Sequence, residues 1–345
     1  MVVLSQPPGE DGLQEVSASG RARGGRLLGA LGGAFLGLVL LTAAAAKSLD
    51  PASFAAEIER HGLARGWVSE LLAIAALGLE AGLGFALLLN LRYRLVLGVA
   101  SGLVLFFLAL TGRDWWLAHH GLLSQETACG CFGNLIERTP KEAFLQDLFL
   151  LLPAAALSWI GRPSGAARSG FWRFVFSSGM AVATMVFAWM SPALPLDDYA
   201  TRLRPGVPLA GLCAGKERDR LCLGDLVPSL ATGRHWVVLA DAKDPAFPAL
   251  SQEINRRIGQ GAGDPVHVLA ELTGDEERKI FWTLAPLYEL HAVPQVLLRS
   301  LYRSLPRSFL VEGGRVVKTS PGLDPDLGAP QLEVEGSGIL EGGVK

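Results

Sequence analysis

The stretch LLGALGGAFLGLVLLTAAAA, residues 27–46, decides the fold of the first half of this chain. It carries no charge, and at about 1.5 Å of rise per helical residue it is long enough to cross a hydrocarbon core of about 30 Å. Residues 43–46 also resemble the cleavage site of a signal peptide, but the leader before Arg26 and the apolar core are longer than such signals usually are. The stretch therefore predicts a membrane-spanning helix.

Four more apolar segments follow it, over residues 71–89, 95–111, 144–160 and 174–194. Glu80 interrupts the first of these, and Asp147 lies near the start of the third. Pro192 and Pro195 close the last one, because proline ends a helix where the chain returns to water. The segments up to residue 160 predict a four-helix membrane bundle, and the last predicts a fifth transmembrane helix.

Positive charge predicts the orientation of these helices. Cytoplasmic loops are enriched in Lys and Arg, and one side of the bundle receives Arg21, Arg23, Arg26, Arg92, Arg94, Arg162, Arg168 and Arg173. The opposite loops also carry basic residues, so the bias is moderate. We expect a multi-pass protein of the inner (cytoplasmic) membrane with a cytoplasmic N-terminus. The loops 47–67 and 113–142 and everything after residue 194 are then extracytoplasmic.

The composition divides the chain in two. Half of the 345 residues are apolar and the formal net charge is only -2. Near-neutral charge argues against nucleic acid as a partner, whereas the apolar half requires a lipid bilayer. We expect a disordered cytoplasmic N-terminus over 1–25, the membrane domain over 26–162, the fifth transmembrane helix over 171–194, a soluble α/β domain over 200–320 and a disordered tail over 321–345.

The string Cys129-Gly130-Cys131-Phe132-Gly133 in the second outer loop is the motif that carries chemistry. A disulfide between residues two apart closes a small strained ring, and the glycine between them relieves part of that strain. Strained disulfides are easily reduced, and they exchange with a partner's thiols through a mixed disulfide. Cys129 and Cys131 are therefore the candidate redox pair. In the alternative interpretation, each of them pairs with Cys213 or Cys222 as a plain staple.

Metal and haem are further interpretations of the same region. His119 and His120 lie just upstream of the cysteines and could complete a thiolate and imidazole site for copper or zinc. Adjacent histidines beside Trp115 and Trp116 at a membrane surface are more often ordinary interfacial residues. No histidine lies within a predicted span, so an axial haem ligand is missing. We expect no metal and no bound cofactor, and the sequence does not indicate whether a quinone takes part.

Glu80 lies near the middle of the second predicted span. An ionised carboxylate there is costly unless it faces the bundle interior or a partner. Lys47, directly after the first span, is the nearest candidate counter-charge, although a lysine at a helix end usually extends its ammonium group to the interface. Gly82 and Gly84 would permit close helix contact, which we interpret as ordinary small-residue packing.

Three strings taken together resemble the MauE branch of the DoxX-like membrane proteins, the methylamine utilisation protein family. They are Ala46-Lys47-Ser48-Leu49-Asp50-Pro51 with Phe54 following, Leu79-Glu80-Ala81-Gly82-Leu83, and the Cys-Gly-Cys-Phe-Gly string. The resemblance covers about residues 27–160 and implies a four-helix membrane bundle. It also implies a connection with methylamine metabolism, where the family is associated with maturation, including disulfide formation, of the periplasmic methylamine dehydrogenase small subunit.

Short apolar strands and amphipathic helices alternate after Pro195. Residues 236–240 and 267–270 predict buried strands with a helix over 247–258 between them. Two further strands, 308–311 and 315–317, flank a Glu-Gly-Gly turn and predict a β-hairpin. This order resembles the thioredoxin-like fold, in which Pro306 stands where that family keeps a cis-proline before a strand.

The soluble domain departs from an active thioredoxin in its cysteines. Thioredoxins carry Cys-x-x-Cys directly after the first of these strands, where this chain has Asp241-Ala242-Lys243-Asp244-Pro245. The domain's own pair, Cys213 and Cys222, brackets a charged segment. We expect a structural disulfide there that stabilises the domain by about 2 to 3 kcal/mol. The alternative is a relocated redox pair.

These patterns favour a membrane protein of the MauE type that supports thiol–disulfide exchange or the maturation of exported proteins. We expect its partner to be an exported client or a thiol oxidoreductase on the extracytoplasmic side, and the sequence leaves open whether the chain is itself an enzyme. The alternative is a non-catalytic assembly factor or scaffold whose disulfides are structural. A third hypothesis, a metal-handling membrane protein, predicts bound copper or zinc that is lost on Cys129→Ser.

Overall fold

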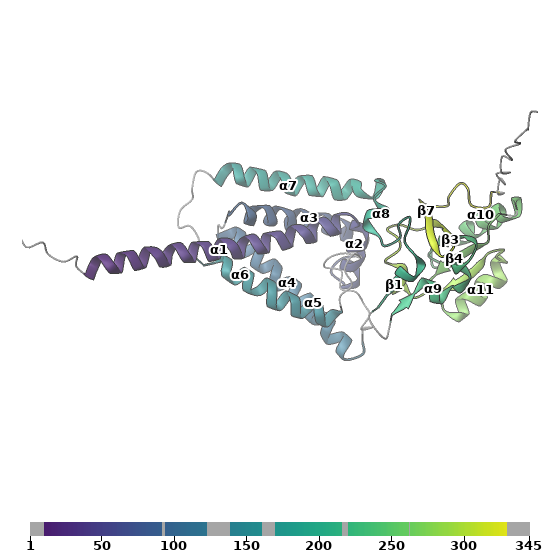
Figure 1. The fold of residues 1–345 in the computed structure, drawn as a ribbon, viewed down its shortest axis with the longest axis horizontal. Coiled ribbons are helices and arrows are strands. Elements are labelled where there is room, and N and C mark those ends of the chain that lie inside the picture. The colour runs from purple at the N-terminus through teal and green to yellow at the C-terminus, as the bar shows by residue number, and fades with distance from the viewer. Residues whose placement is uncertain are drawn as a thin grey trace, which may run out of the picture. The chain divides into compact units, whose positions relative to one another are not determined.

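The computed structural model of this chain describes residues 10–91, 94–122, 139–160, 170–215, 220–261 and 263–329. The chain divides into two compact units, Met1–Ala200 and Thr201–Lys345. The first unit is helical, and the second contains the β-sheets and shorter helices (Figure 1). The boundary lies where the sequence predicts the change from membrane helices to a soluble α/β domain.

The first unit consists of α1 (Glu10–Ser48), α2 (Pro51–Arg60), α3 (Trp67–Leu88), α4 (Arg94–His119), α5 (Pro140–Gln146), α6 (Leu152–Ser158), α7 (Gly170–Met190) and α8 (Asp197–Ala200). Among the described residues, 4 stretches are long and apolar enough to cross a membrane, namely Gly24–Ser48, Trp67–Leu88, Arg94–His119 and Gly170–Ala193. They confirm four of the five predicted helices.

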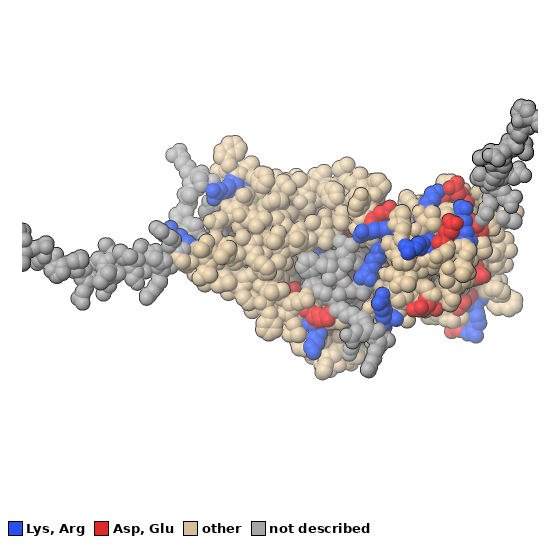
Figure 2. All heavy atoms as spheres, viewed as in Figure 1, with Lys and Arg blue, Asp and Glu red and all other residues tan. Residues whose placement is uncertain are grey.

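The outer surface of these helices is apolar, as a lipid-facing surface requires. Leu95, Trp172 and Trp189 are among many large apolar side chains that are exposed in this unit. In the view of Figure 2, the helical unit shows few charged residues, whereas Lys, Arg, Asp and Glu are numerous on the C-terminal unit. Monomeric soluble proteins rarely expose so continuous an apolar surface.

The predicted fourth span, residues 144–160, is not a single regular helix. α5, a π-helical turn over Asp147–Leu151 and α6 follow one another without a break. Pro153 lacks a backbone N–H and cannot donate the regular helical bond at its position, which accounts for an irregular turn just before it. A fifth span is therefore not established, and the orientation of the chain stays a prediction.

Glycines allow the long helices to approach one another closely. A Cβ atom added at Gly37 of α1 would lie 2.7 Å from the carbonyl oxygen of Gly84 in α3, and one added at Gly84 would lie 2.9 Å from that of Gly37. Gly32 makes a similar approach to α6, since its Cβ would lie 3.1 Å from the carbonyl oxygen of Ala154. These contacts support the interpretation of the glycines as small-residue packing.

The first helix is longer than expected. α1 begins at Glu10, whereas we predicted disorder over residues 1–25. Once a helix is nucleated, each added residue contributes a hydrogen bond, so the strongly helical apolar span can extend the helix into a polar leader.

The second unit is built on a five-stranded sheet. Its strands are β3 (Arg234–Leu239), β4 (Val266–Ala270), β5 (Glu289–Ala292), β6 (Arg307–Glu312) and β7 (Arg315–Pro321), in the spatial order β5-β4-β3-β6-β7. β3, β4 and β5 are parallel, and β6 and β7 are antiparallel to their neighbours. β5 was not predicted. This order does not by itself establish a thioredoxin-like fold.

Alternate residues of the central strands face two different cores. Trp236 and Val238 pack with α10 (Phe247–Gln260) and α11 (Gly274–Leu284) on one face. Val237 and Leu239 face the opposite core, which includes residues of α9 (Leu223–Leu226) and α12 (Gln295–Leu298). The sheet is therefore covered on both faces, as parallel strands require.

The ends of this sheet confirm one prediction and correct another. The β6–β7 hairpin turns at Gly313 and Gly314, both with positive φ, as a two-residue turn of this kind requires. The peptide bond between Leu305 and Pro306 is cis. We expected a disordered tail from residue 321, but Asp324 and Leu327 are buried against the domain because hydrogen bonds and apolar contacts hold residues 321–329 in place.

Candidate functional site

The first unit, Met1–Ala200, is called the membrane unit from here on. Its interior contains a buried ion pair that joins α1 to α3. Lys47 Nζ lies 2.6 Å from Glu80 Oε1, and both side chains are almost completely buried. The structure thus brings together the two polar residues that the sequence singled out. Lys47 lies at the end of a membrane helix, but its ammonium group points into the bundle rather than toward the interface.

Aromatic rings surround the ammonium group. Lys47 Nζ lies 4.6 Å from the centroid of the Phe54 ring and 4.9 Å from that of Phe107. Both distances suit cation–π attraction, which strengthens where water is excluded. Glu80 Oε2, by contrast, has no hydrogen-bond partner among the described residues. The pair therefore combines one well-surrounded cation with one carboxylate that retains an unused acceptor.

The turn after α1 places Lys47 and Phe54. The side chain of Asp50 accepts a hydrogen bond from the backbone N–H of Ser53, and Pro51 occupies the first turn of α2. A carboxylate cap followed by proline is a strong helix start. The two strings that carry the family resemblance in the first two spans therefore meet at one place, the Lys47–Glu80 pair.

The second unit contains one disulfide, between Cys213 and Cys222. Its S–S distance is 2.06 Å. The two residues stand opposite each other in the short antiparallel pair of β1 (Cys213–Ala214) and β2 (Leu221–Cys222). Because these two cysteines are bonded to each other, neither is available for a disulfide with the second outer loop, which is what the alternative interpretation requires. Whether it is structural or exchangeable stays a prediction.

The predicted redox pair, Cys129 and Cys131, lies outside the described residues. His119 and His120 end α4, and His120 Nδ1 lies 2.8 Å from the carbonyl oxygen of Trp116. Within the described part of the chain, neither histidine belongs to a group of three convergent metal-ligand atoms. The centroid of the His120 ring also lies 4.4 Å from that of the Trp116 ring.

The loop after β3 has a structural role in place of a catalytic cysteine pair. The backbone N–H of Lys243 donates to the carboxylate of Asp241 at 2.9 Å, and that of Ala246 donates to Asp244 at 2.8 Å. These side-chain bonds fold the loop that leads into α10. Because the loop holds no cysteine, thioredoxin exchange cannot take place there.

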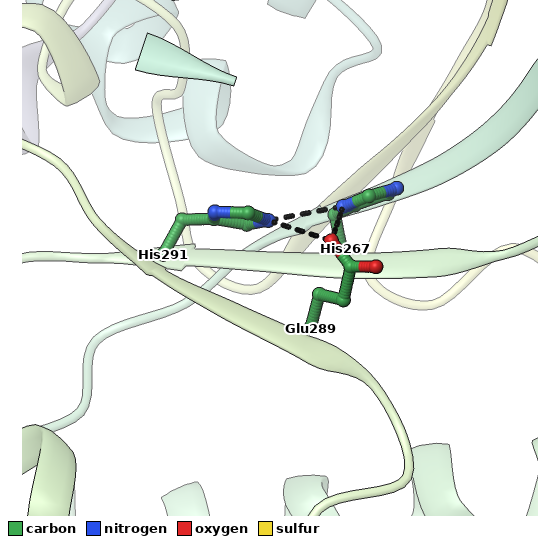
Figure 3. Close-up of side chains that lie close together, drawn as sticks. All are labelled: His267, Glu289 and His291. Carbon is green, nitrogen blue, oxygen red and sulfur yellow. Dashed lines mark hydrogen bonds and ion pairs between the residues drawn. The ribbon is translucent and has the colours of Figure 1, made fainter. Parts of the chain in front are cut away.

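Sequence analysis missed a cluster of histidines on the sheet. His235 of β3, His267 of β4 and His291 of β5 lie side by side, with Glu289 of β5 next to them. Figure 3 shows His267, Glu289 and His291 with their polar atoms directed at one another. The signal was the position of His267 within a predicted strand, but its neighbours depend on the pairing of β3, β4 and β5.

Burial lowers the pKa of two of these histidines. It lowers the pKa of His267 to about 4, although the carboxylate of Glu289 acts in the opposite direction. Burial also lowers the pKa of His291, again against the effect of Glu289. Near neutral pH both imidazoles are therefore neutral and each offers one nitrogen lone pair.

Comparison with protein families gives a match within the membrane unit. Residues 26–160 match the family model described as "Methylamine utilisation protein MauE", which confirms the resemblance drawn from the sequence. The match includes Lys47 and Glu80 and ends before the second unit. A search of curated proteins finds no match for the chain.

Proposed function

We propose that this membrane protein, whose residues 26–160 are of the MauE type, supports thiol–disulfide exchange during the maturation of exported proteins. Cys129 and Cys131 are the proposed exchanging pair. The family name connects the segment with methylamine utilisation, so a protein of that pathway is the first client to consider. The second unit would then bind the client or a partner oxidoreductase.

The observation that carries this proposal is the disulfide between Cys213 and Cys222. Disulfides persist in oxidising compartments and are rare in the cytosol. The bond therefore supports an extracytoplasmic position for the second unit. Thiol–disulfide chemistry on that side of the membrane is the chemistry that the Cys129–Cys131 string could perform.

With five membrane spans, the loop of Cys129 follows the third span and the second unit follows the fifth, so both would lie on the same side of the membrane. The helical run 140–158 measures about 28 Å at 1.5 Å per residue, close to the thickness of a hydrocarbon core. Its Leu151, Ala154 and Ala155 pack in the core of the bundle, while Phe149 and Leu150 are exposed. One buried and one exposed apolar face suit a spanning helix at the edge of a bundle.

The proposed exchange consumes one disulfide for each disulfide formed. A client thiolate attacks one sulfur of the Cys129–Cys131 bond and forms a mixed disulfide, and the client's second thiolate then displaces that cysteine. Two electrons pass from the client to the loop, which is left as a dithiol. A further turnover requires a partner oxidoreductase whose disulfide takes these electrons from the loop.

A second candidate function is a non-catalytic assembly factor. The absence of cysteine between β3 and α10 favours it, because the second unit cannot exchange disulfides in the thioredoxin manner. In this case the unit would hold a client while another protein oxidises it, and both cysteine pairs would be structural.

Single-turnover oxidation of a reduced dithiol peptide distinguishes the two functions. Full-length oxidised protein in detergent should convert about one equivalent of peptide to its disulfide. The double variant C129S/C131S should lose this activity, whereas C213A/C222A should retain it. If the wild type oxidises no peptide, or if C129S/C131S is as active as the wild type, the exchange proposal is wrong and the assembly factor replaces it.

A further inference from the structure

Three atoms from two neighbouring strands converge on one point of the C-terminal sheet. His267 Nδ1 lies 3.0 Å from His291 Nε2 and 3.2 Å from Glu289 Oε2, and His291 Nε2 lies 3.5 Å from the same oxygen. The pairing of β4 with β5 produces this arrangement, since His267 stands opposite Glu289 and Leu269 opposite His291. All three side chains project from one face of the sheet.

These separations fit the coordination sphere of a small divalent ion. Zinc binds imidazole nitrogen and carboxylate oxygen at about 2.0 to 2.2 Å, so tetrahedral ligands lie about 3.3 to 3.6 Å apart. The three measured distances of 3.0, 3.2 and 3.5 Å are close to that edge length. A point about 2 Å from all three atoms therefore lies just off the plane that they define.

Hydrogen bonds on the far side of His267 direct its free lone pair at this point. His235 Nε2 lies 2.7 Å from the carbonyl oxygen of Thr232, which can only accept, so this nitrogen donates. In the tautomer that carries its proton on Nε2, His235 accepts at Nδ1, so the nitrogen 3.0 Å from it, His267 Nε2, donates. His267 Nδ1 is left without a proton, facing the carboxylate.

The assignment of donors and acceptors also shows why a cation suits the site. His267 Nδ1 and Glu289 Oε2 are both acceptors, and at 3.2 Å they face each other. Only His291 Nε2 can place a proton among the three atoms. A metal ion would accept a lone pair from each of them at once. Metal-binding histidines typically donate their other ring N–H to a fixed partner, as His267 does to His235.

We propose that His267 Nδ1, His291 Nε2 and Glu289 Oε2 bind a divalent transition-metal ion of the zinc class. Two imidazoles and one carboxylate suit such ions, whereas calcium and magnesium prefer oxygen ligands alone. Three protein ligands leave a fourth position for water or another donor. The proposal concerns the second unit alone and does not depend on exchange by Cys129 and Cys131.

Zinc titration of the full-length chain in detergent, purified without a histidine tag and stripped of metal, tests this site. Competition with a chromophoric chelator should give one Zn²⁺ per chain. Glu289→Gln and His291→Asn should each weaken the affinity for Zn²⁺ at least 10-fold. Glu289 is largely exposed, so its substitution should leave the circular dichroism and melting temperature of the metal-free protein unchanged.

Two matched controls separate this site from adventitious binding. Glu312→Gln removes an exposed carboxylate from β6 of the same unit, and H119N/H120N removes the exposed histidine pair of the membrane unit. Both should bind Zn²⁺ as tightly as the wild type. The proposal is overturned if Glu289→Gln and His291→Asn keep the wild-type affinity, or if H119N/H120N or C129S abolishes binding. Sulfur ligands in the X-ray absorption spectrum of the zinc-loaded protein would also overturn it.

Discussion

Removing one member of the Lys47–Glu80 pair should destabilise the membrane unit strongly, and removing both should not. At the observed separation of 2.6 Å, the attraction between the two charges is about 6 kcal/mol for an effective dielectric constant of about 20. Desolvation of the two groups offsets much of this attraction while both are present. With one partner gone, the remaining charge stays buried without compensation.

Lys47→Met and Glu80→Met are therefore expected to cost about 3 to 5 kcal/mol each. The double variant K47M/E80M should be close to the wild type, because neither charge remains to be desolvated and methionine fills similar space. The Arg60–Glu57 pair of α2 provides the control, since it is more exposed at a comparable 3.0 Å. Arg60→Gln should cost less than about 1 kcal/mol.

The free energy of unfolding can be measured on the full-length protein by titrating a mild detergent with SDS and following the circular dichroism of the helices. The double-mutant cycle should give a total cost several kcal/mol below the sum of the single costs. If either single variant costs less than about 1 kcal/mol, or if the two costs add, the pair does not hold α1 and α3 together.

Three further predictions concern packing, acid stability and the disulfide. Gly84→Ala should cost about 1 to 3 kcal/mol because its Cβ would lie 2.9 Å from the carbonyl oxygen of Gly37, whereas Gly98→Ala, which meets nothing within 4 Å, should be neutral in the same SDS titration. Burial alone would raise the pKa of Asp324, but hydrogen bonds from Ser320, Lys318 and the backbone N–H of Asp326 outweigh it and lower that pKa below 3.8. The second unit should therefore lose stability as the pH falls below about 4. The Asp324→Asn variant should be less stable than the wild type at neutral pH and should lose less stability on acidification, which amide exchange in β6 and β7 can measure. Equal acid sensitivity in both proteins would contradict this prediction. C213A/C222A removes a cross-link between residues with a sequence separation of 9, which should lower the stability of the second unit by about 2 to 3 kcal/mol. Urea unfolding measures this change, and an unchanged stability would mean that the bond is not structural.

The features that the sequence predicted well are those set by local composition. Long uncharged stretches specify membrane helices, and a lone carboxylate within one of them requires a partner, so Glu80 and Lys47 could be connected before their contact was known. The β6–β7 hairpin was equally accessible, because two adjacent glycines between two short apolar strands leave few other conformations.

The features that escaped prediction depend on pairing between distant segments. His267, His291 and Glu289 meet because β4 and β5 are parallel in one particular register, and the short β5 has too little apolar pattern to be recognised. Asp324 lies in a segment whose composition suggests disorder, yet it is buried by bonds to Ser308 and Ser320 that no local pattern reveals. The π-helical turn at Asp147 arises from the proline that follows it.

The redox potential of the Cys129–Cys131 pair in native membranes decides whether this pair can exchange disulfides with a client. Differential alkylation with mass spectrometry, across a series of thiol buffers, reports which cysteines are bonded and at what potential each bond is reduced. The proposed exchange predicts a local Cys129–Cys131 disulfide that is reduced near or above about -200 mV, while the Cys213–Cys222 bond persists to lower potential. A Cys129–Cys131 bond that resists reduction below about -300 mV, or thiols that never pair with each other, would contradict it.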